Sequence, residues 1–379
     1  MSTTLLLLVA FLCAAAGWAL FLFVPSTGGR IGAGVLGLLA AGIGGGIGLP
    51  YAAKAGVSVT TVVACTELAA GVALLVASAV SLAHAVHGWS RFGVVVGVVA
   101  VSYLVLSTVG IAVAATNVPH VSLGRATPAD YDLDYRDVTF RATDGVELSG
   151  WYVPSSNGDA VVLLHGAGST RSSVLDHAAV LARAGYGVLL FDARGHGESS
   201  GRAMDFGWYG DRDVNGAVQF VAQQPDAANG RVLAVGMSMG GEEAIGAAAS
   251  NPKICGVVAE GATGRTADDR AWLSSAYGIR GFGQELVDRV TYGFVDLLTP
   301  ASPPTSLRHA VEEVAPRRVL LIAARRVESE PHATDHIEGG SPKTVDVWVA
   351  PGAGHTGALE ARQSEWIDRV TRFLATARC

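Results

Sequence analysis

Two side chains suited to covalent chemistry lie in glycine-rich turns, and the first is a serine. The segment Gly236-Met237-Ser238-Met239-Gly240 follows the strand-like run Arg231–Val235 and precedes the helix-compatible run Glu242–Ser250. Its glycines permit a sharp strand-to-helix turn that exposes the serine hydroxyl at the end of a sheet, where the helix N-terminus favours developing negative charge. We therefore predict that Ser238 is the nucleophile of an acyl-transfer reaction.

The second side chain is His355, which follows the last strand-like run in Pro351-Gly352-Ala353-Gly354-His355. A serine hydroxyl at its ordinary pKa is a weak nucleophile and needs a histidine base within hydrogen-bond reach. The flanking glycines would let His355 swing over the sheet end towards Ser238, and we predict that it is this base. His165 and His196 also lie in glycine turns beside strand ends, and we interpret them as structural.

A serine and histidine pair also needs an acid that orients the histidine, and its expected place is soon after the strand-like run Arg318–Ala323. No aspartate directly follows that run, where the sequence continues Arg325-Arg326-Val327-Glu328-Ser329-Glu330-Pro331. Glu328 is nearest to the expected spacing and is the predicted acid. The alternatives, in descending order, are Glu330, Glu260 and Asp335.

Two backbone N–H groups must stabilise the oxyanion that forms when a serine attacks a carbonyl carbon. One belongs to the residue after the nucleophile, which is Met239, and the other to a loop after an earlier strand. The loop His165-Gly166-Ala167-Gly168 follows the strand-like run that ends at Leu164. We predict Ala167 as the second donor.

The sequence favours neither a metal site nor a cofactor site. His332 and His336 are four residues apart and could share a metal on one helix face, but a third ligand is not evident. The cysteines do not form the pattern of a disulfide framework, because Cys13 and Cys65 lie in apolar stretches and Cys379 is the last residue.

The elements that would hold these side chains alternate between strand-like and helix-like runs. Asp144-Gly145 predicts a hairpin between Val138–Ala142 and Val146–Val153. Further strand-like runs are Ala160–Leu164, Gly187–Phe191, Arg231–Val235, Cys255–Ala259, Arg318–Ala323 and Val345–Val349. Buried strands that alternate with helices predict an α/β domain with a parallel sheet. The stretch 261–316 is too long for a plain crossover and contains several aromatic residues, so we predict an inserted cap there.

The combined motifs resemble the α/β-hydrolase superfamily. The resemblance covers almost all of residues 130–379, and it rests on Gly150-Trp151-Tyr152-Val153-Pro154, the loop at His165, Asp192-Ala193-Arg194-Gly195-His196-Gly197-Glu198-Ser199, the turn at Ser238, and His355. It implies a mostly parallel eight-stranded sheet and a triad of serine, histidine and acid, as in esterases, thioesterases, lipases or peptidases. The acid is usually an aspartate in this superfamily, and the glutamates here depart from that pattern.

The first part of the chain has a composition that suits a membrane. Up to residue 124 only Arg30, Lys54, Glu67 and Arg91 are charged, whereas the remainder holds 56 of the 60 charged residues and a net charge of −8. About 20 apolar helical residues span a bilayer core, and the segments that meet this are Leu5–Val24, Ile31–Leu49, Thr61–Val86 and Gly93–Ala115. We predict a bundle of four transmembrane helices in residues 1–120, which makes the chain a multi-pass protein of the cell membrane. The α/β domain is expected in residues 121–379.

Glycines and one acid distinguish these apolar segments. The pairs Gly42 with Gly46 and Gly44 with Gly48 allow close backbone approach between helices in lipid. Glu67 is the only acid within the spans, and its place near a helix end suits a hydrogen-bonded carboxylate as well as a functional one.

Together these features predict a membrane-anchored serine hydrolase that cleaves an ester, thioester or amide through an acyl-enzyme, with a small-molecule or lipid acyl substrate. Residues 1–120 are expected to anchor the enzyme and to contribute nothing to the chemical step. The alternatives are a non-catalytic membrane sensor or transport partner, and an acyltransferase that uses the same triad. The acidic balance argues against a nucleic-acid partner, and the composition is typical of a GC-rich bacterial genome. The oligomeric state and the side of the membrane are not predicted.

Overall fold

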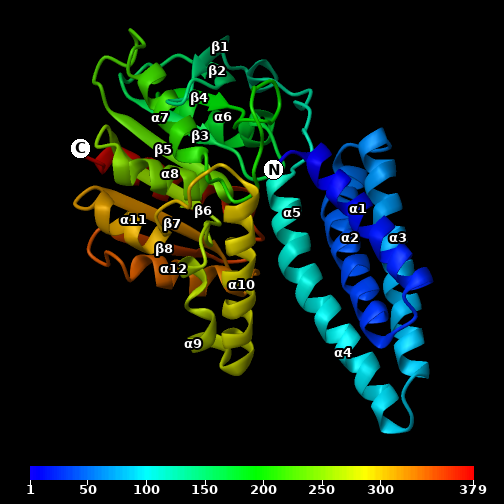
Figure 1. The fold of residues 1–379 in the computed structure, drawn as a ribbon. Coiled ribbons are helices and arrows are strands. Elements are labelled where there is room, and N and C mark those ends of the chain that lie inside the picture. Colours follow the sequence, from blue (N-terminus) through cyan, green and yellow to red (C-terminus); the bar gives the residue numbers. More distant parts are fainter. The chain divides into compact units, whose positions relative to one another are not determined.

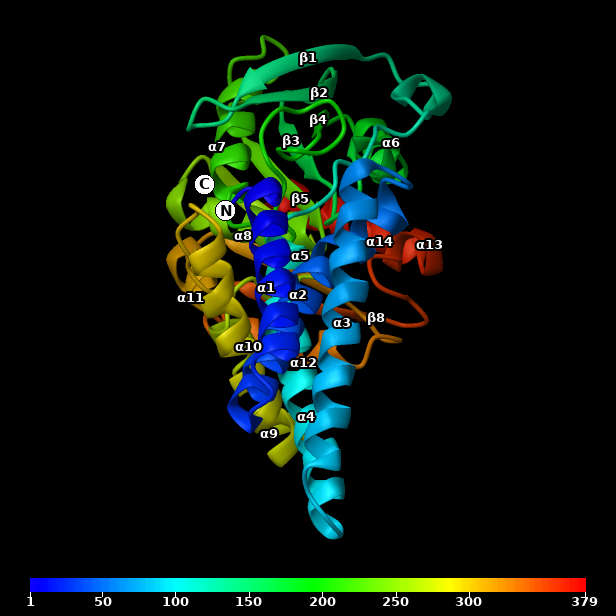
Figure 2. The ribbon, with the colours of Figure 1, turned by 45° about the vertical axis from the view of Figure 1, so that its right-hand side comes forward.

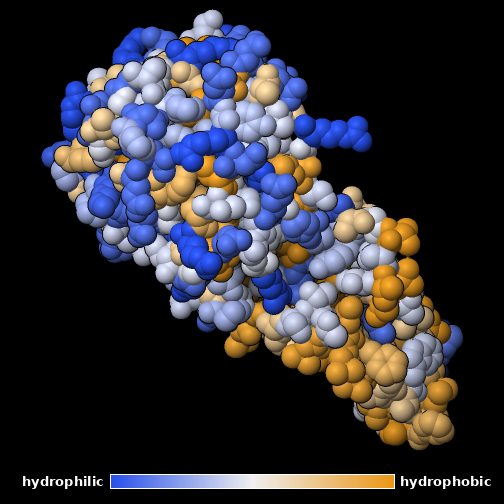
Figure 3. Space-filling view, turned by 90° about the horizontal axis from the view of Figure 1, so that it is seen from above, coloured by the Kyte–Doolittle hydropathy of each residue, from blue (hydrophilic) through white to orange (hydrophobic).

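The structure is a computed structural model of residues 1–379, and its chain divides into two compact units. The helical unit consists of Met1–Pro119 and Leu286–Pro300, and the α/β unit consists of His120–Glu285 and Ala301–Cys379. On the face shown in Figure 3, hydrophobic residues gather over the helical unit, whereas the α/β unit is mostly hydrophilic. The two units are described separately below.

Four long apolar stretches of the helical unit are helices, as predicted (Figure 1). They are α1 (Thr3–Phe23), α2 (Thr27–Lys54), α3 (Val59–His84) and a fourth stretch, Trp89–Thr116, made of α4 (Trp89–Val105), a π-helical turn (Leu106–Gly110) and α5 (Ile111–Thr116). The side chains of Ser2, Ser26 and Ser58 accept hydrogen bonds from the first turns of α1, α2 and α3. Each stretch is long and apolar enough to cross a bilayer.

Glycines set the close approach of α2 to its neighbours. A Cβ atom at Gly44 would lie 2.7 Å from the carbonyl oxygen of Ala64 on α3, and one at Gly46 would lie 2.6 Å from the carbonyl oxygen of Gly110. Because neither position has room for a side chain, α2 packs backbone to backbone on two sides.

The α/β unit contains one sheet of eight strands in the order β1-β2-β4-β3-β5-β6-β7-β8 (Figures 1 and 2). The strands are β1 (Arg136–Arg141), β2 (Glu147–Val153), β3 (Ala160–Leu164), β4 (Gly187–Phe191), β5 (Val232–Met237), β6 (Ile254–Glu260), β7 (Arg318–Ala324) and β8 (Val345–Ala350). β2 pairs antiparallel with both β1 and β4, and the other pairs are parallel. The sheet is therefore mixed, and the carboxyl ends of β3 to β8 lie along one edge.

Helices cover both faces of the sheet and bury two separate apolar clusters. On one face lie α7 (Gly210–Val221), α8 (Met239–Ser250) and α11 (Leu307–Val314). On the other face lie α6 (Leu175–Arg183), α13 (Ala358–Ala361) and α14 (Gln363–Thr376). Because β3 to β7 are covered on both faces, almost every residue of these strands is buried, which explains their continuous apolar runs.

The segment between β6 and β7 is the predicted insertion, and it contains α9 (Leu273–Tyr277) and α10 (Ile279–Leu298) before α11. The second half of α10 belongs to the helical unit. There the hydroxyl of Thr291 donates to the carbonyl oxygen of Ser107 (3.3 Å), and Leu298 packs against the apolar cluster that contains Leu6 and Val113. The insertion thus supplies a further helix to the helical unit.

A disulfide joins Cys255 on β6 to Cys379, across a sequence separation of 124 residues. The sequence analysis did not predict this bond, because the two cysteines are distant in the chain and one is the last residue. Cys13 and Cys65 are free.

Candidate active site

Ser238 occupies a strained turn between β5 and α8. Its φ of 53° and ψ of −122° are unusual for a residue other than glycine. A Cβ atom at Gly236 would lie 2.2 Å from the carbonyl oxygen of Gly240, and one at Gly240 would lie 2.6 Å from the carbonyl oxygen of His165. Both glycines are therefore needed for the chain to turn here and to present the serine at the sheet edge.

His355 lies within hydrogen-bond reach of this serine. Its Nε2 is 2.9 Å from the Oγ of Ser238, although 117 residues separate the two in the sequence. The loop that carries His355 follows β8 and contains two residues with positive φ, Gly352 (78°) and Thr356 (52°). The structure thus brings the predicted nucleophile and the predicted base together.

The acid that contacts this histidine is Glu330. Its Oε1 lies 2.7 Å from the Nδ1 of His355, and its Oε2 accepts a hydrogen bond from the backbone N–H of Ala324 (2.6 Å). Glu330 is completely buried, near the start of α12 (Ser329–Glu338). A buried carboxylate with both oxygens bonded holds the imidazole in one orientation.

The expected contact between Glu328 and His355 is wrong, because α12 begins directly after Glu328. Successive helical residues are turned by about 100°, so side chains two positions apart point in nearly opposite directions. Glu328 is consequently exposed, and it faces Tyr277, whose pKa is raised by desolvation and by this carboxylate. Asp335 is exposed on the same helix.

Glu260, the third alternative, has a different environment at the end of β6. Its carboxylate accepts hydrogen bonds from the backbone N–H of Ala358 (2.7 Å) and from the indole N–H of Trp366 (2.9 Å). Both donors lie shortly after His355 in the chain, so Glu260 fixes the position of the loop that carries the histidine. Sequence reasoning missed this role.

The Glu330 carboxylate changes the proton affinity of the histidine. Its hydrogen bond raises the pKa of His355 and outweighs the lowering effect of burial. The pairing stabilises the imidazolium that forms when the histidine takes up a proton.

The two predicted oxyanion donors lie on either side of the nucleophile. Met239 is the first residue of α8, so its N–H has no acceptor within the helix. The loop that contains Ala167 passes next to Ser238, since a Cβ atom at Gly166 would lie 3.2 Å from the Cβ of the serine. The structure therefore brings both donor segments beside Ser238.

His165 and His196 have the contacts of structural side chains. The Nε2 of His165 accepts from the backbone N–H of Ala193 (3.0 Å), and its Nδ1 lies 2.8 Å from the carbonyl oxygen of Gly166. The two rings are 5.2 Å apart in an edge-to-face arrangement. Burial lowers the pKa of each histidine to about 4, so both are neutral at neutral pH.

The motif after β4 supplies a buried ion pair that sequence reasoning did not assign. Asp192 pairs with the guanidinium of Arg171 and accepts from the backbone N–H groups of Arg171 (2.8 Å) and Glu198 (3.0 Å). These bonds join the loop after β3 to the loop after β4. The sequence motif that contains Asp192 was recognised as Asp192-Ala193-Arg194-Gly195-His196-Gly197-Glu198-Ser199. Its ion-pair partner Arg171 lies outside this motif, so the pair was not predicted.

His332 and His336 lie on α12, as their spacing suggested. The ring of His332 stacks on Trp272 with centroids 5.5 Å apart. The structure contains no cluster of three or more histidine, cysteine or acidic side chains that could hold a metal ion.

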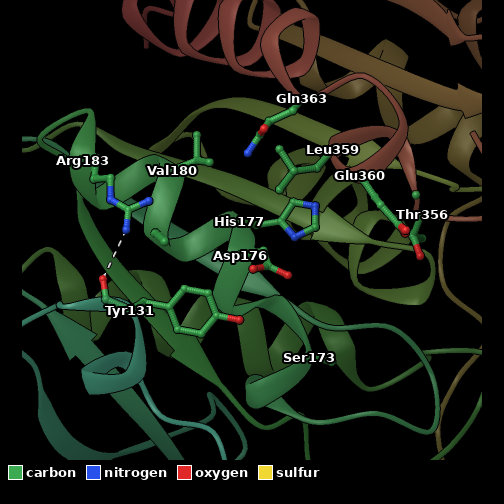
Figure 4. A pocket seen from close by; sticks show the side chains of 12 residues that line it. Tyr131, Ser173, Asp176, His177, Val180, Arg183, Thr356, Leu359, Glu360 and Gln363 are labelled. Carbon is green, nitrogen blue, oxygen red and sulfur yellow. Dashed lines mark hydrogen bonds between the residues drawn. The ribbon is translucent and has the colours of Figure 1, made fainter.

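A pocket of about 500 Å³ opens on the α/β unit beside the histidine loop (Figure 4). Thr356 and Gly357 line it together with Tyr131, Asp176 and Arg183, and Arg183 donates to the carbonyl oxygen of Tyr131 (3.3 Å). The pocket therefore borders the segment that follows the predicted base.

Comparison with known proteins gives relatives for the α/β unit. A family model described as serine aminopeptidase, S33, matches residues 155–294. An uncharacterised protein of Mycobacterium tuberculosis is 35% identical over 120 residues, which are 31% of this chain and 42% of that protein. A thiohydrolase of Aspergillus aculeatus, AneE, is 36% identical over 124 residues, or 32% of this chain and 39% of that protein. The chain thus spans less than half the length of these curated relatives.

One solved structure and one further sequence relative are similar over a larger share of the chain. An esterase of Pyrococcus furiosus superposes with a TM-score of 0.55 at 26% identity, covering 70% of this chain and 98% of the esterase. The Arabidopsis thaliana protein WAV2, named as containing an alpha/beta hydrolase domain, is 21% identical over 241 residues, which are 60% of this chain and 77% of that protein.

Proposed function

We propose that the chain is an α/β hydrolase, and specifically a membrane-anchored serine hydrolase that cleaves esters or thioesters of fatty acyl groups. Its similarity to an esterase, to a thiohydrolase and to the family model supports the proposal. The observation that carries the proposal is the continuous hydrogen-bonded chain from Ser238 through His355 to Glu330. A fold that served only for binding would not need all three groups in this order.

The geometry accounts for the first half of the reaction. The Nε2 of His355 takes the proton of Ser238 as the serine Oγ attacks the carbonyl carbon of the substrate. The carbonyl oxygen becomes an oxyanion that accepts hydrogen bonds from the N–H groups of Met239 and Ala167. The intermediate then expels the alcohol or thiol, which receives the proton from His355, and leaves the acyl group on the serine.

The second half restores the enzyme. Water attacks the acyl-enzyme while His355 takes one of its protons, and the second tetrahedral intermediate releases the carboxylic acid and the Ser238 hydroxyl. The Glu330 carboxylate stabilises the imidazolium in both halves. No metal or cofactor is needed for this sequence of steps.

The insertion between β6 and β7 supports the proposal that the substrate is an acyl compound from a bilayer. Half of α10 belongs to the helical unit, where it exposes Leu286, Val290 and Leu297. These positions fall on one side of the helix, as in helices that contact the apolar part of a membrane. A segment that follows the β6 strand of the α/β unit would thus meet lipid together with the four apolar helices.

The proposal is tested by labelling the full-length protein with a fluorophosphonate probe. We expect stoichiometric labelling of the wild type and none of Ser238→Ala, because only an activated serine reacts. The matched control is Ser200→Ala, an exposed serine in the same unit. Labelling of Ser238→Ala at the wild-type level would exclude Ser238 as the nucleophile. Membrane anchoring is tested separately by flotation of the protein with liposomes.

A series of p-nitrophenyl esters then tests the acyl preference. We expect kcat/KM to rise from acetate to longer acyl chains when the protein is reconstituted in vesicles. If acetate gives the highest kcat/KM of the series, the hydrolase proposal stands and the fatty acyl substrate is rejected.

A further inference from the structure

A groove of about 230 Å³ lies within the helical unit between α2, α3 and α4. Its apolar lining includes Ile31, Val35, Leu38, Leu75, Leu82 and Val101. We propose that the groove binds one anionic phospholipid of the surrounding bilayer, with an acyl chain between the helices and the phosphate at Arg30. The inference rests on the proposed membrane location and is independent of the hydrolytic reaction.

The groove arises because α4 packs loosely against its neighbours. α2 buries twelve of its 28 residues, whereas α4 buries none between Trp89 and Val105. Gly97 of α4 lines the groove, and a Cβ atom there would meet no other atom within 4 Å. The space beside Gly97 is therefore open and apolar, and an acyl chain fills such a space without leaving a backbone group unpaired.

One end of the groove is cationic. Arg30 lines it at the start of α2, and the fourth apolar stretch begins on the same side of the bundle with Arg91, because successive spans alternate in direction. The only acid of residues 1–119 is Glu67, which lies nearer the other end of α3. The arginines at this end therefore attract a negatively charged head group. A choline head group carries a positive charge of its own, which the arginines would repel.

Arg30 is positioned to bind this head group. One of its guanidinium nitrogens donates to the carbonyl oxygen of Phe21 (2.5 Å), and the guanidinium lies 4.0 Å from the centre of the Phe21 ring. These contacts orient the side chain, and because a guanidinium has five N–H donors, others stay available for phosphate oxygens.

A second polar group lies deeper in the groove. Ser78 of α3 is 1% exposed, lines the groove, and its hydroxyl has no hydrogen-bond partner. A Cβ atom at Gly34 would lie 3.3 Å from the Cβ of Ser78, which places the serine about one helical turn, or about 6 Å, below Arg30. In a phospholipid, the ester carbonyls follow the phosphate towards the acyl chains. The Ser78 hydroxyl can therefore donate to an ester carbonyl oxygen when Arg30 holds the phosphate.

Native mass spectrometry of the full-length protein tests this binding. The experiment uses Ser238→Ala in mild detergent, so that added lipid is not consumed, and compares dioleoyl phosphatidylglycerol with dioleoyl phosphatidylcholine at equal concentration. We expect one phosphatidylglycerol per chain and an apparent affinity about fivefold higher than for phosphatidylcholine, the effect of about one cation near a lipid surface. Equal binding of the two lipids would overturn the proposal.

Variants of α4 and α2 locate the lipid. Gly97→Leu should fill the groove and abolish the adduct. The matched control is Gly93→Leu, one turn earlier on the same helix, where a Cβ atom also meets no other atom within 4 Å but where the residue does not line the groove. Arg30→Gln should remove the preference for phosphatidylglycerol and leave weak, equal binding of both lipids.

Two further outcomes would contradict the proposal. Retention of the adduct in Gly97→Leu would place the lipid elsewhere. A wild-type dimer that Gly97→Leu converts to monomers would identify a second copy of the chain as the occupant. Fluorophosphonate labelling of Gly97→Leu with Ser238 intact shows that the fold survives. If the wild type fails to label but still binds phosphatidylglycerol, the hydrolase proposal fails and the lipid site stands.

Discussion

The α/β unit and the helical unit place their polar groups in opposite ways. In the α/β unit, arginines enter the core as ion pairs, as Arg171 does with Asp192 and Arg265 does with Asp211. In the helical unit, Arg30 bonds to a backbone carbonyl and stacks on a ring, and glycines replace side chains at the helix contacts. The α/β unit thus fixes loops through charge, and the helical unit fixes helices through close backbone approach.

The largest effect should come from the buried acid of the α/β unit. Glu330→Gln keeps the shape of the side chain but removes the charge that orients His355 and stabilises its imidazolium. We expect kcat on p-nitrophenyl esters to fall by about 10⁴-fold, as for loss of the acid in other triads. Glu328→Gln is the matched control and should change kcat little, because Glu328 is exposed and distant from this contact. If Glu328→Gln loses its activity and Glu330→Gln keeps it, the assignment of Glu330 as the acid is rejected.

This acid is also the part of the site that the sequence could not locate. The turn at Ser238 and the loop at His355 were predictable, because their glycines mark backbone turns that follow buried strands. The choice between Glu328 and Glu330 depends on where α12 begins, and a shift of that start by two residues reverses the direction of each side chain. Spacing alone does not contain that information.

The strands of the sheet were also predictable from the sequence. Buried strands appear as apolar runs, so seven of the eight predicted runs end within one residue of the end of the observed strand. The eighth, Arg231–Val235, ends two residues before the end of β5 at Met237. The division of α10 between the two units was not predictable, because its apolar residues alternate with charged ones such as Asp288 and Arg289. The groove beside Gly97 depends on how tightly α4 packs, which composition does not indicate.

Glycine substitutions should break the close contacts of each unit. Gly236→Ala places a Cβ 2.2 Å from the carbonyl oxygen of Gly240, and Gly71→Ala places one 2.4 Å from the carbonyl oxygen of Gly37 on α2. Because the opposing atoms are backbone, we expect each variant to lose about 1–3 kcal/mol of unfolding free energy or more. Scanning fluorimetry in detergent measures the loss.

The controls are glycines with open surroundings in each unit. At Gly283 and Gly97 a Cβ would meet no atom within 4 Å, so Gly283→Ala and Gly97→Ala should melt near the wild-type temperature. Fluorophosphonate labelling separates the two test variants, since Gly236→Ala should lose labelling at the Ser238 turn and Gly71→Ala should keep it while folded. Wild-type melting of both test variants would show that the close approaches are not rigid.

Removal of residues 1–124 should have an intermediate effect. The proposed triad and both proposed oxyanion donors lie in the α/β unit, so the remaining chain should still react with the fluorophosphonate. It should nevertheless require detergent, because Leu298 of α10 loses the apolar cluster of Leu6, Ile43 and Val113. Size-exclusion chromatography with and without detergent measures this requirement. A monomer that is stable without detergent would show that α10 does not need the helical unit.

The smallest predicted effect is a change in pH dependence. His355 must be neutral to accept the serine proton, so kcat/KM should increase as pH rises through the pKa of this histidine. The Glu330 carboxylate raises that pKa above its ordinary value of about 6.5, and the increase should therefore occur at a higher pH than for a free imidazole. This increase is the acidic limb of the pH profile. In Glu330→Gln the residual activity should show the acidic limb at lower pH, whereas in Glu328→Gln the limb should not move. Burial lowers the pKa of His165, His177 and His196 to about 4, so these histidines remain neutral across the assay range and cannot produce the limb. A limb that stays in place in Glu330→Gln would show that a group other than His355 controls the reaction.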